Sequence, residues 1–181
     1  MASWTKIAHR IRVPVGFVFA GFYLWLARPS WVCLAAGGAI VAIGVALRAY
    51  ASGYLRKASE LTTSGPYAYT RNPLYLGSLI IAAGFALAAR SLWVVLALAV
   101  IFLAIYVPVM DFEEQFLRSQ FPAFDEYAGQ VPRLLPRFSA AGGGRGEFSW
   151  DLYRKHREYN AALGAAAVLA VLVFKLVWLR S

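Results

Sequence analysis

Five apolar runs decide what kind of fold this chain can form. They cover residues 13–27, 31–50, 74–89, 91–110 and 161–179. A helix needs about 20 apolar residues to cross a bilayer core, and aromatic or arginine flanks at the interface extend the shorter runs. Hydrophobic residues make up 60% of the chain and charged residues only 15%, too few to cover a soluble surface. The sequence predicts one all-α domain, residues 1–181, a polytopic membrane bundle of about five helices with cytoplasmic interfacial helices.

The connections between the runs predict their arrangement and orientation. Only Arg28-Pro29-Ser30 separates the first two runs, and little more than Arg90 separates the third from the fourth, so both pairs form tight hairpins. Fourteen of the 18 Lys and Arg residues fall on the side of the N-terminus and four on the other side. This excess predicts that the N-terminus and both long connections face the cytoplasm. We expect the first run to stay as an uncleaved helix, since WLARPSW is a poor cleavage site.

Cysteine, histidine and net charge argue against several classes of site. Cys33 is the only cysteine and lies within an apolar run, and His9 and His156 are far apart in the sequence. We therefore expect neither a disulfide framework nor a metal site built on these side chains. The formal net charge is +9, which in a membrane protein fits a surface facing anionic headgroups. Membrane lipids are the expected partners, and nucleic acid is not.

A dense polar motif, GPYAYTRNPLYLG, occupies residues 65–77 between the second and third runs. One interpretation is structural: Gly65-Pro66 forms a turn, Asn72-Pro73 caps and starts a helix, and the tyrosines lie in an interfacial belt. The other interpretation is functional. A helix start offers unpaired amides and a positive dipole end, Arg71 adds a planar clamp for an anion, and tyrosine rings can face a cation. Such a site would bind a ligand that carries both charges.

A second dense segment, DFEEQFLRSQFPAFDEYAGQVPRLLPRF, covers residues 111–138. It begins where the fourth run ends, so Glu113 and Glu114 are expected at the membrane boundary. Its regularly spaced phenylalanines make it amphipathic, and we expect it to fold back onto the other helices. Its acidic groups could hold an ammonium group or ribose hydroxyls and so complement Arg71.

The first motif, followed after one helical hairpin by EEQFL, EY and VPRLLP, resembles the isoprenylcysteine carboxyl methyltransferase and phospholipid methyltransferase superfamily. The resemblance covers residues 60–138. It implies a small membrane enzyme that uses S-adenosylmethionine to methylate a lipophilic, membrane-embedded acceptor. Tyr127 and Arg133 fall where the family closes the pocket and meets the acceptor. The implied cofactor site is made of residues from both motifs: Tyr67, Arg71, Asn72, Pro73, Tyr75, Leu76, Gly77, Glu113 and Glu114.

Three positions depart from the family pattern. Asn72 stands where histidine is usual, and asparagine keeps a hydrogen bond but does not titrate. Phe124 occupies a frequent tyrosine position, and Gln130 replaces an arginine often found before Val-Pro. These changes bear on the acceptor more than on methyl transfer. Two acceptors therefore stay open, a prenylcysteine carboxyl group and a phosphatidylethanolamine-type amine.

The chemistry of the acceptor decides whether the site needs a base. Methyl transfer from a sulfonium donor is an in-line displacement that depends on alignment and on exclusion of water. A carboxylate is already nucleophilic, whereas a protonated amine must first lose a proton, for which Glu113, Glu114 and Tyr127 are candidates. Two other classes of protein remain open: a sterol-reductase-like enzyme that uses NADPH, and a membrane scaffold without catalytic activity.

Outside the motifs the chain carries weaker signals. The segment FSWDLYRKHREYNAAL, residues 148–163, predicts an interfacial helix ahead of the last run. We expect His156 and Glu158 to lie on the surface of that helix. Gly37-Gly38 and Gly44, within the second run, predict close packing against another helix.

Overall fold

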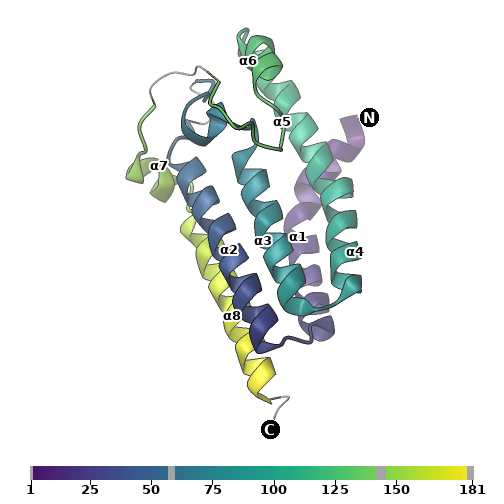
Figure 1. Ribbon diagram of the computed structural model, residues 1–181. Helices are drawn as coiled ribbons and strands as arrows, with labels where there is room; N and C mark the ends of the chain where they lie inside the picture. Colours follow the sequence, from purple (N-terminus) through teal and green to yellow (C-terminus); the bar gives the residue numbers. More distant parts are fainter. Residues whose placement is uncertain (1, 57–59, 142–145, 179–181) are drawn as a thin grey trace.

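The structure, a computed structural model, describes residues 2–56, 60–141 and 146–178, with side chains from Pro14 onward. Its described part is a bundle of long helices that carries short helical turns at one end (Figure 1). In chain order the elements are α1 (Ala2–Leu26), α2 (Trp31–Ser52), the 3-10 turn η1 (Gly65–Ala68), α3 (Pro73–Ala89), α4 (Leu92–Ile101), the π-helical turn η2 (Phe102–Tyr106), α5 (Val107–Gln120), α6 (Phe124–Gln130), α7 (Trp150–Lys155) and α8 (Tyr159–Trp178).

The two ends of the bundle differ in what they hold (Figure 1). The N-terminus, η1, α6 and α7 gather at one end, which we call the site end. The α1–α2 and α3–α4 turns lie at the other, which we call the hairpin end, so both predicted hairpins are confirmed. Which side of a membrane each end faces stays a prediction. Three of the positive residues counted above lie outside the described residues: Lys57, Arg145 and Arg180. Three others have side chains that the structure does not describe: Lys6, Arg10 and Arg12.

Three helices in the described part of the chain are long and apolar enough to cross a bilayer. They are α2, the continuous helix Leu92–Gln120 and α8. The other two predicted spans correspond to shorter apolar helices, Pro14–Leu26 and Pro73–Ala89. At a rise of about 1.5 Å per residue, the 17 residues of α3 extend about 26 Å, slightly less than a bilayer core. The all-helical membrane bundle is confirmed; α3 is short for a span, whereas α1, whose apolar part is Pro14–Leu26, is 25 residues long.

The fourth span continues beyond its predicted end. The helix was expected to stop near residue 110 and fold back, but it runs without a break to Gln120. Residues 111–120 are rich in Glu, Gln, Leu and Arg, which favour helix even where the sequence has become polar. The chain reverses only at Phe121, where Pro122 follows and disfavours helix in the residue before it. Glu113 and Glu114 therefore stand on a rigid helix rather than on a loop.

A π-helical turn interrupts this long helix at residues Phe102–Tyr106, where the N–H of Val107 donates to the carbonyl of Phe102. Pro108 follows directly. A proline inside a helix has no N–H to donate, and its ring crowds the carbonyl four residues earlier. The wider π-helical turn accommodates Pro108 while the helix keeps its direction.

Close packing of α2 on α3 forms the centre of the bundle. A Cβ atom added to Gly37 would lie 2.5 Å from the carbonyl oxygen of Gly84, and one added to Gly44 would lie 2.7 Å from that of Gly77. Larger residues would force the helices apart, so these glycines set their spacing. The predicted packing role of Gly37 and Gly44 is confirmed.

Apolar side chains from five helices fill the hairpin end. The two tight turns are joined there, since Arg28 N donates to Ala89 O at 2.9 Å. Lys175 on α8 donates its Nζ to the carbonyl of Leu24 at 2.6 Å, which satisfies a carbonyl at the end of α1. The buried residues of this core are Tyr23, Ala27, Leu34, Ala88, Ala89, Val94, Leu172 and Leu176.

The segment predicted as one interfacial helix is two pieces. It breaks after α7, at Arg157, whose φ of 53° lies in the left-handed region. The turn packs on the end of α2: the Nδ1 of His156 lies 3.2 Å from the Ser52 carbonyl, and the side chain of Glu158 is only 13% exposed. The prediction that Glu158 lies on the surface is therefore wrong, because the break turns it inward.

Candidate active site

The two polar motifs meet at the site end of the bundle, on the side chain of Glu114. Its Oε1 accepts a hydrogen bond from Asn72 Nδ2 at 3.0 Å, and it lies 3.3 Å from Arg71 Nε and 3.5 Å from Arg133 Nε. We call these four residues the Glu114 cluster. The side chains of Arg71 and Glu114 are 16% and 15% exposed, so the charges interact in partly desolvated surroundings. Residues 42 positions apart in the chain are thus brought together.

The segment that follows α6 closes over the first motif. Arg71 N donates to Pro132 O at 2.9 Å, and Arg137 N donates to Tyr69 O at 3.0 Å. Residues 132–141 therefore run beside η1 and the start of α3. Pro132 has a restricted backbone, which lowers the entropy lost when this segment docks. The docking places Arg133 next to Glu114.

Asn72 holds the cluster together instead of capping α3. It stands at the N-cap position, but its side chain makes no capping hydrogen bond. The side-chain amide of Asn72 donates to Glu114 and, at 3.1 Å, to the carbonyl of Arg133. The predicted cap is therefore wrong, because the side chain has better partners in the tertiary structure.

Two of the three motif tyrosines are interior rather than interfacial. Tyr67 is 7% exposed. Tyr75 donates its hydroxyl to Glu113 Oε1 at 2.9 Å, and its ring meets that of Tyr106 edge-on at 5.9 Å between centroids. Tyr69, which is 40% exposed, fits the interfacial belt. Tyr75 thus joins the carboxylate of α5 to the aromatic ring of η2.

Tyr127 closes the site as a hydrogen-bond donor. Its hydroxyl donates to the Tyr67 carbonyl at 2.8 Å. Burial raises the pKa of the Tyr127 phenol above its ordinary value, and nearby Arg71 opposes the rise while Glu114 adds to it. Burial also raises the pKa of Tyr67. Both phenols stay protonated at neutral pH, so the geometry disfavours Tyr127 as a base.

The charges of the site fit a ligand with a carboxylate and net positive charge. The site holds three carboxylates and two guanidinium groups: both arginines lie near Glu114, Arg133 Nη2 donates to Asp111 at 2.6 Å, and Glu113 accepts from Tyr75 instead. The Nε atoms of both arginines are buried, and no described residue gives them a hydrogen bond of normal geometry. Glu114 Oε1, at 3.3 Å and 3.5 Å, is the carboxylate oxygen that faces them.

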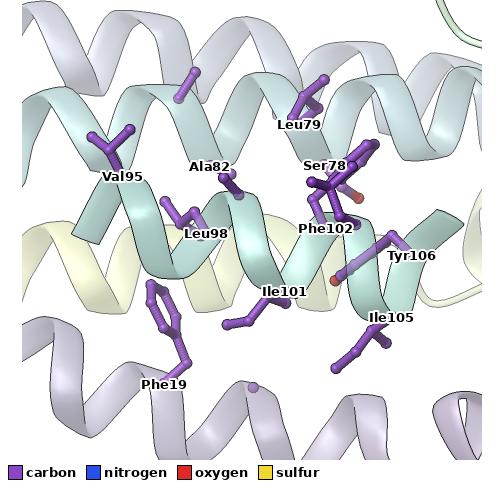
Figure 2. A pocket seen from close by; sticks show the side chains of 14 residues that line it. Phe19, Ser78, Leu79, Ala82, Val95, Leu98, Ile101, Phe102, Ile105 and Tyr106 are labelled. Carbon is purple, nitrogen blue, oxygen red and sulfur yellow. The ribbon is translucent and has the colours of Figure 1, made fainter. Parts of the chain in front are cut away.

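An apolar groove of about 480 Å³ lies between α1, α3 and the helix formed by α4 and η2. Figure 2 shows Phe19 and Val95 towards one end of it, and the hydroxyl groups of Ser78 and Tyr106 towards the other. The helix rise gives it a length of about 16 Å between these ends. Because Tyr106 packs on Tyr75, the polar end of the groove adjoins the site.

Some motif residues lie apart from the Glu114 cluster. Leu76 lines a second cavity, of about 620 Å³, between α2, η1, α3 and residues 136–141. Gly77 faces α2, where an added Cβ would lie 2.6 Å from Arg48 Cγ. Pro73 is buried at the first position of α3. A cofactor-binding role for these three residues stays a prediction.

Comparison with known proteins decides the family. The model of the family described as phospholipid methyltransferase matches residues 32–123, half of the chain, and includes Asn72, Tyr75 and Glu114. The chain is 36% identical over 164 residues to the cobalt-zinc-cadmium resistance protein CzcN of Cupriavidus metallidurans, covering 85% of this chain and 74% of that protein. This chain belongs to the phospholipid methyltransferase family.

Another relative is the nickel-cobalt-cadmium resistance protein NccN of Alcaligenes xylosoxydans xylosoxydans. It is 38% identical over 90 residues, which are 50% of this chain and 41% of that protein. No solved structure matches the chain significantly. The match to the phospholipid methyltransferase family ends before Tyr127 and Arg133.

Sequence reasoning missed two charged residues in and around this candidate site. Asp111, the first residue of the second motif, pairs with Arg133. Arg48 interrupts the apolar run of α2 and binds Glu158. A charged residue within a membrane span is costly and by default suggests function. That signal was available for Arg48, whereas its partner could not be read from the sequence.

Proposed function

We propose that this chain transfers a methyl group from S-adenosylmethionine to a lipophilic acceptor that reaches the site from the bilayer. The observation that carries the proposal is the position of the Glu114 cluster beside the polar end of the apolar groove. Glu113, Tyr75 and Tyr106 form the connection between them. A charged donor and a lipid acceptor need such neighbouring polar and apolar compartments.

The residues at the site have separable roles in this proposal. When bound, S-adenosylmethionine supplies the methyl group carried by its sulfonium sulfur. Arg71, beside the positive dipole end of α3, binds its carboxylate, and the acidic side chains of Glu113 and Glu114 face its positive groups. Tyr127 and the segment that follows α6 exclude water, which an in-line displacement requires.

The acceptor is proposed to be a prenylcysteine carboxyl group, as in isoprenylcysteine carboxyl methyltransferases. The apolar lining and 480 Å³ volume of the groove suit one hydrocarbon chain. The alternative is a phosphatidylethanolamine-type amine, which must lose a proton before it attacks. Glu113 is then the candidate base, because Tyr75 holds it near the polar end of the groove.

The names of both relatives refer to metal resistance. Among the described residues of this chain, no group of three or more His, Cys, Asp or Glu side chains is placed to hold a metal ion. We propose that any part this chain has in metal resistance acts through its methylated product.

Two measurements test the proposed function. Calorimetric titration of the purified protein with S-adenosylmethionine and with NADPH should show binding of the first alone. Binding of NADPH alone would instead support a reductase, and binding of neither a scaffold. Incubation with a lipid extract and labelled methyl donor should then give a labelled lipid whose identity names the acceptor. A rate that is flat with pH around neutrality would argue against an amine of high pKa.

A further inference from the structure

A partly buried ion pair outside both motifs joins the start of α8 to α2. Arg48 donates two hydrogen bonds to Glu158, from Nε to Oε2 at 3.0 Å and from Nη2 to Oε1 at 2.9 Å. The two side chains are 22% and 13% exposed. A bidentate contact fixes the plane of the guanidinium group, so Glu158 determines where the remaining nitrogen of Arg48 points.

That remaining nitrogen reaches the first turns of α3. Arg48 Nη1 donates to Leu74 O at 3.1 Å and to the hydroxyl of Ser78. Leu74 and Ser78 flank Tyr75, which binds Glu113. Ser78 also lines the polar end of the apolar groove. Arg48 therefore connects α8 to the part of α3 that lies between the charged site and the groove.

The glycine at the end of the first motif makes room for this connection. A Cβ atom on Gly77 would lie 2.6 Å from Arg48 Cγ and 2.9 Å from the carbonyl oxygen of Gly44. Any larger residue would push away the stem of Arg48 as well as the backbone of α2. The close approach of Arg48 thus explains why position 77 needs a glycine.

The pair also adjoins the buried phenol of the site. Burial is the main cause of the raised pKa of Tyr67; nearby Tyr127, Glu113 and Glu158 add to the rise, and Arg48 opposes it. Glu113 and the Arg48–Glu158 pair therefore act on the same side chain. The pair belongs to the surroundings of the site and not only to the helix interface.

We propose that Arg48 and Glu158 are positioning residues for methyl transfer. Glu158 orients Arg48, and Arg48 holds the start of α3 so that Tyr75 and Ser78 keep the acceptor aligned with the donor. The inference rests on the proposed function. Because Glu158 lies outside the region matched by the family model, it gives the site a third contributing segment besides the two motifs.

The test compares the variants Glu158→Gln and Glu147→Gln in the full-length protein. Glu147 is exposed and precedes α7, which makes it a matched control. Three quantities are measured for each: the Kd for S-adenosylmethionine, turnover with a total lipid extract and labelled donor, and hydrogen exchange of the amides of residues 74–78. Two further variants are compared: Arg48→Ala removes the guanidinium group, and Arg48→Lys keeps the charge but not the bidentate geometry.

Glu158→Gln should lower turnover about tenfold or more while the Kd for S-adenosylmethionine changes less than about twofold. Exchange at residues 74–78 should become faster, and Glu147→Gln should change nothing. Arg48→Lys should recover part of the turnover lost in Arg48→Ala. A purely structural contact would not separate turnover from cofactor affinity in this way.

Several results would overturn the inference. Unchanged exchange in Glu158→Gln would show that the pair does not hold α3, and faster exchange with normal turnover would make the pair structural only. A rise in Kd as large as that of Arg71→Ala would assign the pair to the cofactor. If the wild-type protein neither binds S-adenosylmethionine nor forms labelled lipid, the proposed function fails and the positioning role with it. The exchange data would still show separately whether the pair holds α3.

Discussion

At the hairpin end, Val94 and Leu172 are fully buried among other apolar side chains, and Arg28 N donates to Ala89 O across the two turns. At the site end, α3 and α5 are joined instead through the carboxylate of Glu114 and the groups that surround it. Desolvating charged groups costs free energy that their attraction often fails to recover. A bundle that needed stability alone would use the arrangement of the hairpin end at both ends. The difference agrees with the ligand-binding role that we propose for the site end.

The two ends should therefore respond differently to mutation. Lipid is as apolar as the hairpin core, so that core is stabilised by packing rather than by transfer from water. The site end depends on matched charges, whose loss leaves a partner buried and unpaired. Variants at the hairpin end should change stability and leave ligand affinity unchanged, whereas variants at the site end should change both or affinity alone.

The largest effect is expected for Glu114→Ala, because it leaves Arg71 and Arg133 without their shared carboxylate. Removing one partner of a buried pair costs about 3–5 kcal/mol. The melting temperature should fall, and binding of S-adenosylmethionine should be lost in calorimetry. Glu126→Ala, an exposed carboxylate on α6, is the control and should match wild type. Normal binding in Glu114→Ala would remove this cluster from the site.

The next largest effect is expected for Arg71→Ala. Losing a partly buried guanidinium group at the start of α3 should weaken S-adenosylmethionine binding by about 2 kcal/mol, roughly 30-fold in Kd. Arg56→Ala is the matched control, because Arg56 is 52% exposed and pairs with Glu60 at 3.4 Å on the surface. Equal effects of the two substitutions in calorimetry would reduce the first motif to a structural turn.

Leu172→Ala tests the hairpin end. The substitution leaves a cavity and should lower the free energy of unfolding by about 2 kcal/mol, at the low end for a buried leucine because lipid is as apolar as the core. The Kd for S-adenosylmethionine should stay unchanged. Leu163→Ala on the same helix, 64% exposed, should leave the melting temperature unaltered. A weaker Kd in Leu172→Ala would show that the two ends are coupled.

The smallest effect is expected for Tyr127→Phe, which keeps the ring and removes one hydrogen bond to Tyr67 O. The cost should be about 1 kcal/mol. The folded state raises the pKa of this phenol, so the stability it contributes is complete below the ordinary tyrosine pKa of 10.0 and falls as pH rises above that value. Melting curves should show a smaller alkaline loss in Tyr127→Phe. The rate between pH 6 and 9 should keep its wild-type shape, and a lost inflection would restore Tyr127 as a base.

Much of the fold could be predicted because its signals are local. Apolar runs and very short connections were enough to predict the helices and both hairpins. The end of the fourth span was misplaced because hydropathy changes at residue 110 whereas the helix ends at Gln120. Hydropathy reports what surrounds a helix, but helix propensity and Pro122 decide where it ends.

The site was predicted in part, for a related reason. Arg71, Asn72 and Glu114 were singled out by motif and are together in the structure. Asn72 was expected to cap its own helix, which is the usual local preference, but Glu114 offers it a charged acceptor. Leu76 and Gly77 belong to the same motif yet face away from the cluster, because the helical turn points them towards α2.

The amino-acid sequence alone determined which segments are helical, which connections are tight and which end of the bundle collects the charged residues. These properties follow from hydropathy and backbone preference within a few residues. The tertiary structure decided the partner of each charge, as in the contact of Arg48 with Glu158 across 110 residues of chain. Such a pairing depends on the register of packed helices and on the Gly44–Gly77 contact that sets their spacing, and no short stretch of sequence contains that information.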